Sequence, residues 1–214
     1  FSVIFGKVAK LPSEGIPYPI LVIAGTLPWY LFSNSLAESS NSLIANAGML
    51  TKVYFPRLAI PVSTIAVSFV DFAISFVILL GMMVYYNFMP DWHILLLPMF
   101  IVISVLASLG GGFWFSALNV KYRDFKFIIP FIVQFGMYVS PVGFSSSIVP
   151  EKYRILYSLN PMVGVIDGFR WSITGKAIDL YVPGFVLSIL IVILLFVSGL
   201  WYFRKMERSF ADVI

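Results

Sequence analysis

Residue types that carry covalent or metal chemistry are scarce in this chain. It has no cysteine and a single histidine, His93, so neither a thiolate site nor a multi-histidine metal site is expected. The sequence also lacks the G-x-x-x-x-G-K-[ST] phosphate loop, the G-x-S-x-G nucleophile motif and the H-E-x-x-H zinc motif. We therefore predict a protein that is not an enzyme, has no catalytic residue, and binds no metal or cofactor.

One carboxylate stands apart, because Asp71 lies in the middle of a long apolar run. A charge at that depth in a membrane is costly and usually faces the protein interior. A proton-coupled transporter would use such a group, but a relay needs several members, and no Lys, Arg or second carboxylate lies deep in another apolar run. We expect Asp71 to be buried and hydrogen-bonded. His93 follows Trp92 and is predicted to lie at the membrane interface.

Four aromatic residues recur at helical spacing, namely Phe127, Phe131, Phe135 and Tyr138. At a rise of about 1.5 Å per residue they form one stripe about 16 Å long. Facing a pore, such rings would stack on sugar rings without gripping any one hydroxyl, and each contact would be weak enough for a moving polymer to leave. The alternative is that the stripe packs against neighbouring helices or lipid.

A short basic loop precedes this stripe and contains Lys121, Arg123 and Lys126. In the simpler interpretation these residues set the membrane topology and contact lipid headgroups. In the other interpretation they receive the pyrophosphate group of a lipid-linked substrate, because a guanidinium matches phosphate oxygens well.

Composition indicates that membrane helices position these residues. Of the 214 residues, 60% are hydrophobic and 11% are charged, with a mean hydropathy of +0.96. Soluble domains are about 45–50% apolar and about 25% charged. We predict an all-α polytopic membrane protein with a single transmembrane domain, residues 1–214. The net charge of +4 is modest, so nucleic acid is not an expected partner.

A membrane helix needs about 20 apolar residues, and the apolar runs with their charged flanks predict the spans. The predicted spans are 1–9 (the end of a first span), 20–36, 59–86, 94–118, 127–142 and 182–203. We infer that a segment upstream of Phe1 completes the first span. Lys and Arg concentrate after spans two, four and six, which predicts that both termini of the six-span protein are cytoplasmic.

Residues 43–55 are too short to span and lie on the Lys/Arg-rich side. An amphipathic helix of this kind either docks in a groove of a partner protein or lies flat at the lipid interface. The residues it would offer to a partner are Leu43, Ala47, Leu50, Lys52 and Tyr54.

Residues 145–179 are mixed and contain two short candidate helices, Glu151–Ser158 and Val163–Thr174. Irregular backbone at membrane depth is tolerated only where protein or water surrounds it, which favours an extracytoplasmic gate. We expect Asp167 to pair with Arg170, three positions later on the same helix. The alternative is a surface loop with interfacial helices. The candidate gate residues are Pro141, Pro150, Asn160, Pro161 and Arg170.

Several short elements, in this order and spacing, resemble the permease subunits of type-two ABC exporters. The resemblance is closest to the Wzm/TagG-like branch, which exports O-antigen, capsule or teichoic-acid polymers. It covers nearly the whole chain. The matching elements are Trp29–Leu36, Phe55-Pro56-Arg57, Tyr122-Arg123-Asp124, Ser140-Pro141, Val149-Pro150, Leu159-Asn160-Pro161 and Phe169-Arg170.

The resemblance implies six spans per subunit, a cytoplasmic coupling helix between spans two and three, and two short helices that re-enter between spans five and six. It also implies a homodimer joined to two ABC ATPase subunits, which bind the ATP and Mg²⁺, in the bacterial inner membrane. The implied substrate is a polyprenyl-pyrophosphate-linked glycan. The alternatives are the same architecture exporting a drug or lipid, or an ion-coupled secondary transporter, against which the lack of evident repeats argues.

Overall fold

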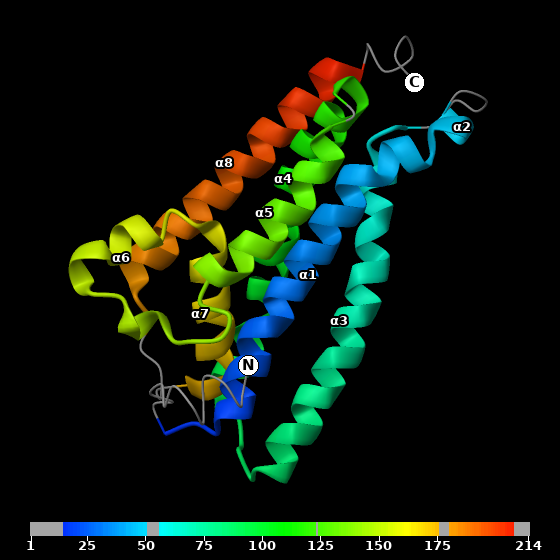
Figure 1. The fold of residues 1–214 in the computed structure, drawn as a ribbon. Coiled ribbons are helices and arrows are strands. Elements are labelled where there is room, and N and C mark those ends of the chain that lie inside the picture. The colour runs from blue at the N-terminus through cyan, green and yellow to red at the C-terminus, as the bar shows by residue number, and fades with distance from the viewer. Residues whose placement is uncertain (1–14, 51–55, 123, 176–179, 208–214) are drawn as a thin grey trace.

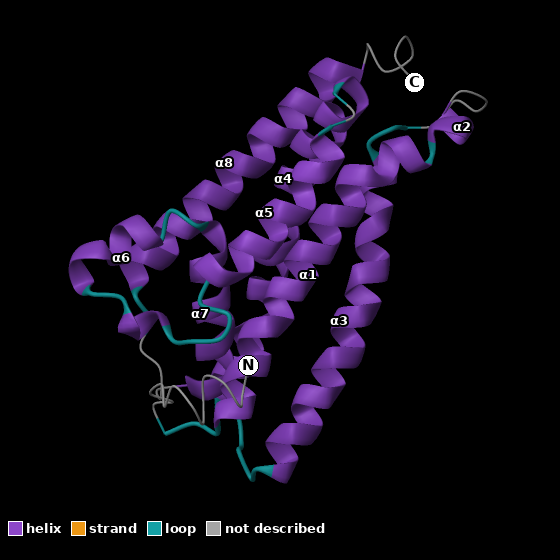
Figure 2. Ribbon diagram, viewed as in Figure 1, coloured by secondary structure: helices purple, strands orange, loops and turns teal. Residues whose placement is uncertain are grey.

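The computed structural model describes residues 15–50, 56–122, 124–175 and 180–207, and every regular element within them is a helix (Figure 1, Figure 2). Four stretches are long and apolar enough to cross a membrane: α1, α3, η2 with α4, and α8. This confirms the prediction of an all-α polytopic membrane protein. The elements are α1 (Tyr18–Ala45), α2 (Ala47–Leu50), α3 (Ala59–Tyr85), η2 (Trp92–Leu96), α4 (Leu97–Lys121), α5 (Phe125–Val139), η3 (Ser146–Ile148), α6 (Glu151–Tyr157), α7 (Pro161–Thr174) and α8 (Val182–Glu207).

The bundle is organised around α1 and α4, which pack along each other, with α3 beside α1 and α8 beside α4 (Figure 1). Small residues allow the close helix crossings. A Cβ atom at Gly199 of α8 would lie 2.3 Å from the Gly110 carbonyl oxygen of α4, so these two backbones are in direct contact. Such contacts are typical of membrane helices, where dispersion between closely approaching backbones replaces the hydrophobic effect.

Helix α1 does not end at Leu36, the last residue of the second predicted span, but continues to Ala45. The polar residues beyond Leu36 are mostly serines, and the hydroxyls of two of them, Ser40 and Ser42, bond back to the helix. Ser40 Oγ donates to the Leu36 carbonyl at 2.5 Å, and Ser42 Oγ donates to the Ser39 carbonyl at 2.7 Å. Because these bonds satisfy the hydroxyls within the helix, the serines are buried without breaking it.

The fifth predicted span, residues 127–142, is a 15-residue helix, α5. At about 1.5 Å per residue it is about 22 Å long, less than the roughly 30 Å hydrocarbon core. The helix ends because Ser140 precedes Pro141, and the residue before a proline is driven to extended backbone. α5 therefore ends part-way along the bundle (Figure 1).

Residues 140–145, which we call the break after α5, have no regular structure. Helix α7 lies beyond this break and packs against α1, α4 and α8. Most of its residues are buried. The predicted second gate helix, Val163–Thr174, is thus present with two more residues at its start, and the first, Glu151–Ser158, is α6. Because α7 lies within the bundle, this part of the segment is not a surface loop.

Candidate functional site

The predicted aromatic stripe is almost uncovered on α5. Phe127, Phe131, Phe135 and Tyr138 are 59–69% exposed, and the rings of Phe131 and Phe135 stack in parallel with centroids 6.0 Å apart. Ile129 is the buried residue of this helix. The four rings therefore do not pack against helices of the described part of their own chain, and they form a free face about three helical turns long.

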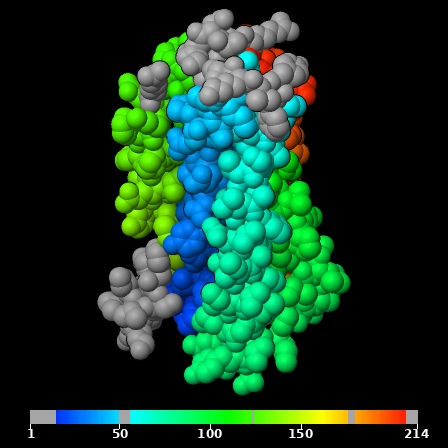
Figure 3. Space-filling view, turned by 90° about the vertical axis from the view of Figure 1, so that its right-hand side faces the viewer, coloured from blue at the N-terminus to red at the C-terminus, as the bar shows by residue number. Residues whose placement is uncertain are grey.

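A groove lies between α1 and α3, and α5 lies on the other side of α1 (Figure 3). It encloses about 440 Å³. Polar side chains line it at helical spacing from both sides: Thr26, Tyr30 and Asn34 on α1, and Ser68, Asp71 and Ser75 on α3.

The expectation that Asp71 is buried and hydrogen-bonded is wrong for this chain. Asp71 is exposed at the groove, and no residue in the described part of the chain bonds to it. The reason is that α3 touches the bundle mainly along α1, so most of its surface is uncovered. A carboxylate at this depth needs water or protein around it, so this face of α3 does not behave as a plain lipid-facing surface.

His93 is buried. Its ring stacks on Trp92 with centroids 4.3 Å apart and meets the Trp171 ring at 4.5 Å. Its Nδ1 lies 3.0 Å from Asp91 Oδ2. These contacts fasten η2 to α7, and within the described residues there is no cluster of metal-ligating side chains.

Arg170 is the central residue of the predicted gate. Its side chain is buried, and it donates to the carbonyls of Leu21 at 3.1 Å, Phe144 at 2.7 Å and Val142 at 2.6 Å. Gly25 makes room for it, because a Cβ there would lie 2.2 Å from Nη2. The guanidinium thus reaches across to α1 and to the break after α5, and the pairing with Asp167 along the helix stays a prediction.

Side chains satisfy the backbone of this break. The carbonyls of residues 142 and 144 accept from Arg170, and the carbonyl of Gly143 between them accepts from the Tyr18 hydroxyl at 2.6 Å. An unpaired carbonyl at membrane depth costs several kcal/mol, on the order of 2–7. Side chains of α1 and α7, rather than backbone N–H groups of a helix, therefore satisfy the carbonyls of this break.

Asn160 connects the start of α7 to the end of α5. Its Oδ1 accepts from the Met162 N–H at 3.0 Å as an N-cap, and its Nδ2 donates to Ser140 Oγ at 2.8 Å. Pro161 follows at the first helical position, where its missing N–H costs nothing. The structure thus brings together four predicted gate residues. Pro150 is the exception: it is exposed at the start of α6.

The described residues among the predicted partner contacts lie at the end of the bundle that also holds α2, the α4–α5 junction and the end of α8 (Figure 1). The predicted start of this short helix at Leu43 is wrong, because α1 continues to Ala45 and α2, of four residues, begins at Ala47. Leu43 belongs to α1 and is buried in a cluster with Phe113 and Phe203. Ala47 and Leu50 fall in α2, with Ala47 half-buried, whereas Lys52 and Tyr54 lie outside the described residues.

Basic residues gather at this same end. Lys121 and Lys126 are exposed, with their Nζ atoms 5.1 Å from the Tyr122 ring and 4.8 Å from the Phe127 ring. Arg123 lies outside the described residues. Arg57 donates to the Glu207 carbonyl, which ties the start of α3 to the end of α8.

A second cavity lies between α6, α7 and the start of α8, and the sequence pattern did not predict it. Its polar residues come from four separated segments, and none of them forms a local motif. Only the packing of α6 brings them together.

Comparison with known proteins identifies the family. The model of the ABC-2 type transporter family matches residues 1–174. The chain is 29% identical over 226 residues to an O-antigen export system permease protein RfbA of Klebsiella pneumoniae, covering 100% of this chain and 83% of that protein. It is 27% identical over 204 residues to an RfbA of Myxococcus xanthus, covering 94% and 78%.

A more distant relative is the polysialic acid transport protein KpsM of Escherichia coli, 21% identical over 211 residues, covering 96% of this chain and 80% of that protein. The family match spans most of the chain and includes α1, the break after α5 and α7, which form the site described above. The chain belongs to the ABC-2 type transporter family of membrane proteins.

Proposed function

We propose that this chain is the membrane subunit of an ATP-driven exporter that moves a polyprenyl-pyrophosphate-linked polysaccharide across the bacterial inner membrane. Two copies form the pore, and two separate ATPase subunits supply the energy. The relatives are named as O-antigen export permeases and as a polysialic acid transport protein, which supports a polysaccharide as cargo.

The observation that carries the proposal is the free aromatic face of α5. Rings at 59–69% exposure, spaced along a helix that ends at a break, offer a moving polymer a series of flat, weak contacts. Each ring can stack on the apolar face of a sugar without a fixed hydrogen bond, so successive sugars pass the same positions. A second copy of the chain would close the pore opposite this face.

The basic end faces the cytoplasm in this proposal, with both termini on that side. Ala47 and Leu50 of α2, with Lys52 and Tyr54, receive the ATPase, and Lys121, Arg123 and Lys126 meet the pyrophosphate headgroup of the substrate. Nucleotide binding would act as a population shift between closed and open arrangements of the break after α5, where Arg170 and Asn160 hold the closed form.

Co-purification tests the partner. The full-length tagged permease, co-expressed with its candidate ATPase and solubilised in mild detergent, is expected to retain the ATPase in about equal amount. A permease that is recovered alone under these conditions would contradict the ABC exporter proposal and direct attention to Asp71 as an ion-coupling residue.

The aromatic stripe is tested by the double substitution Phe131→Ala with Tyr138→Ala. Each ring contributes about 0.5–1.5 kcal/mol of stacking, so export of polymer to the cell surface should fall about tenfold. Thermal stability should hold, because both rings are exposed. The matched control is Leu190→Ala with Leu194→Ala on α8, which removes apolar area of similar exposure (58% and 69%). Normal export by the α5 variant would refute the pore-lining role.

A further inference from the structure

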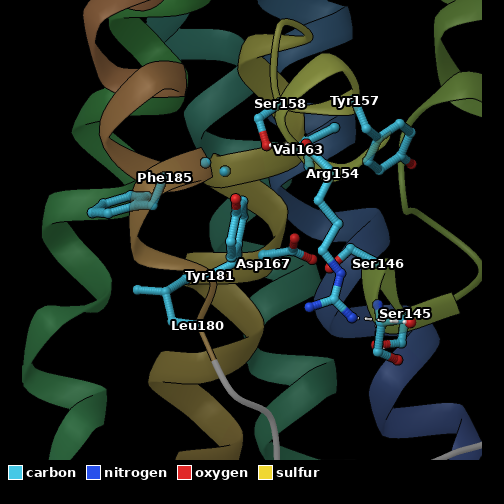
Figure 4. Close-up of a pocket in the computed structure, with 13 residues that line it drawn as sticks. Ser145, Ser146, Arg154, Tyr157, Ser158, Val163, Asp167, Leu180, Tyr181 and Phe185 are labelled. Carbon is cyan, nitrogen blue, oxygen red and sulfur yellow. Dashed lines mark hydrogen bonds between the residues drawn. The ribbon is translucent and has the colours of Figure 1, made fainter. Parts of the chain in front are cut away.

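The cavity between α6, α7 and α8 lies apart from the aromatic stripe and encloses about 270 Å³ (Figure 4). Its walls are strongly polar for a membrane protein. The side chains that carry its chemistry are Arg154 of α6, Asp167 of α7, Tyr181 just before α8, and Tyr157 of α6, beside serines 145–147.

The guanidinium of Arg154 is held in place at the cavity wall. Its Nε donates to the Val149 carbonyl at 3.1 Å, and its Nη2 donates to the Ser147 carbonyl at 3.3 Å. The guanidinium carbon lies 5.9 Å from the centroid of the Tyr181 ring. No residue in the described ranges accepts from Nη1, so this group still has donors to offer a ligand.

Asp167 and Tyr181 complete the wall. Figure 4 shows the Asp167 carboxylate directed toward the same space as the Arg154 guanidinium, with the Tyr181 ring beside them. The hydroxyl of Tyr157 is buried, and no described residue bonds to it. Burial and the nearby Asp167 carboxylate raise the pKa of Tyr157, so this hydroxyl stays protonated and remains a donor.

The charges of this wall select the class of ligand. A phosphate or other anion would be repelled by Asp167, and a cation would be repelled by Arg154. A sugar hydroxyl both donates and accepts, so neighbouring hydroxyls on one ring can donate to the carboxylate and accept from the guanidinium. The flat Tyr181 ring offers a surface for the apolar face of the same sugar.

We propose that this cavity binds one neutral sugar unit, held between Arg154 and Asp167 against the ring of Tyr181. The cavity, at about 270 Å³, is just below the roughly 300–1,000 Å³ range of ligand sites, so it takes a single ring rather than a chain. A bound sugar would join α6 to α7 and to the start of α8. This inference rests on the proposed function, since sugar is the exporter's cargo.

The test measures binding of neutral methyl glycosides to the purified permease–ATPase complex by saturation-transfer NMR. The probes are the methyl glycosides of glucose, galactose and mannose, with inorganic phosphate as the anionic probe. At least one glycoside is expected to bind, and phosphate is not. Asp167→Asn and Arg154→Met should each weaken glycoside binding at least about tenfold, because each removes a charge-assisted hydrogen bond.

The matched controls are Glu151→Gln and Lys152→Met, which change the same charges on the exposed face of α6 and should leave binding unaltered. Only the part of the glycoside signal that Asp167→Asn and Arg154→Met remove is assigned to this cavity, which separates it from contacts at the stripe. Asp167→Asn is isosteric, and its melting temperature is compared with that of the parent protein to show that it folds.

Three results would overturn the inference: binding of none of the glycosides, binding that Asp167→Asn leaves unchanged, or binding of phosphate that depends on Arg154. Failure of the proposed function is seen separately, as loss of ATPase co-purification or of a polymer product. A complex that exports polymer and binds no glycoside at this cavity would refute this inference alone.

Discussion

Arg170→Met should lower the free energy of unfolding by about 3 to 5 kcal/mol, the largest effect expected for a single side chain in this protein. The substitution retains much of the side-chain volume but removes every donor. The carbonyls of Val142 and Phe144 would then be buried in the break after α5 without Arg170. Because the same guanidinium also bonds the Leu21 carbonyl, the contact between α7 and α1 would weaken with them.

The measurement is thermal unfolding of the detergent-solubilised protein, followed by tryptophan fluorescence and by recovery of the monodisperse peak on size exclusion. Arg170→Lys should fall between the parent and Arg170→Met, since a single ammonium retains the charge but lacks the planar fork that reaches three carbonyls. Arg204→Met, at an exposed position in the last turn of α8, is the control and should melt as the parent does. Equal melting temperatures for the Arg170 and Arg204 variants would show that the carbonyl contacts add no stability.

Gly199→Val should destabilise the bundle by about 3 kcal/mol, because it places a branched side chain where two backbones touch. The added Cβ would lie 2.3 Å from the Gly110 carbonyl oxygen and 3.1 Å from Trp114 Cδ1. The first of these neighbours is helix backbone, which no rotamer change can move. α4 and α8 would have to separate, and the dispersion contacts along their whole interface would weaken.

The matched control is Gly81→Val in α3, where nothing lies within 4 Å of an added Cβ. Both substitutions place valine in a membrane-spanning helix, so differences in helix propensity cancel between them. The same melting and size-exclusion measurements apply. If the two variants proved equally stable, the close approach of α4 and α8 would not contribute to holding the bundle together.

The sequence was sufficient to locate the long membrane helices and the family. Transfer of a side chain into lipid is favourable or unfavourable for each residue nearly independently, so a run of apolar residues marks a span wherever it occurs. Local backbone chemistry was also readable: Pro141 ends α5 and Asn160-Pro161 starts α7, since each acts on its immediate neighbours. The polar run after Leu36 does not end α1, because buried serines bond to the carbonyls of the helix itself.

Only the tertiary structure decided which side chains share a site. Arg170 bonds carbonyls that lie 149, 28 and 26 residues away in sequence, and the cavity at Arg154 joins four segments with no common motif. Asp71 was expected to be buried, yet lies exposed in a groove between two helices. Hydropathy predicts that a helix enters the membrane, but it does not predict which face of the helix packs against a neighbour. Those faces are set by the fit of small residues such as Gly25 and Gly199, and that fit exists only once the helices have packed.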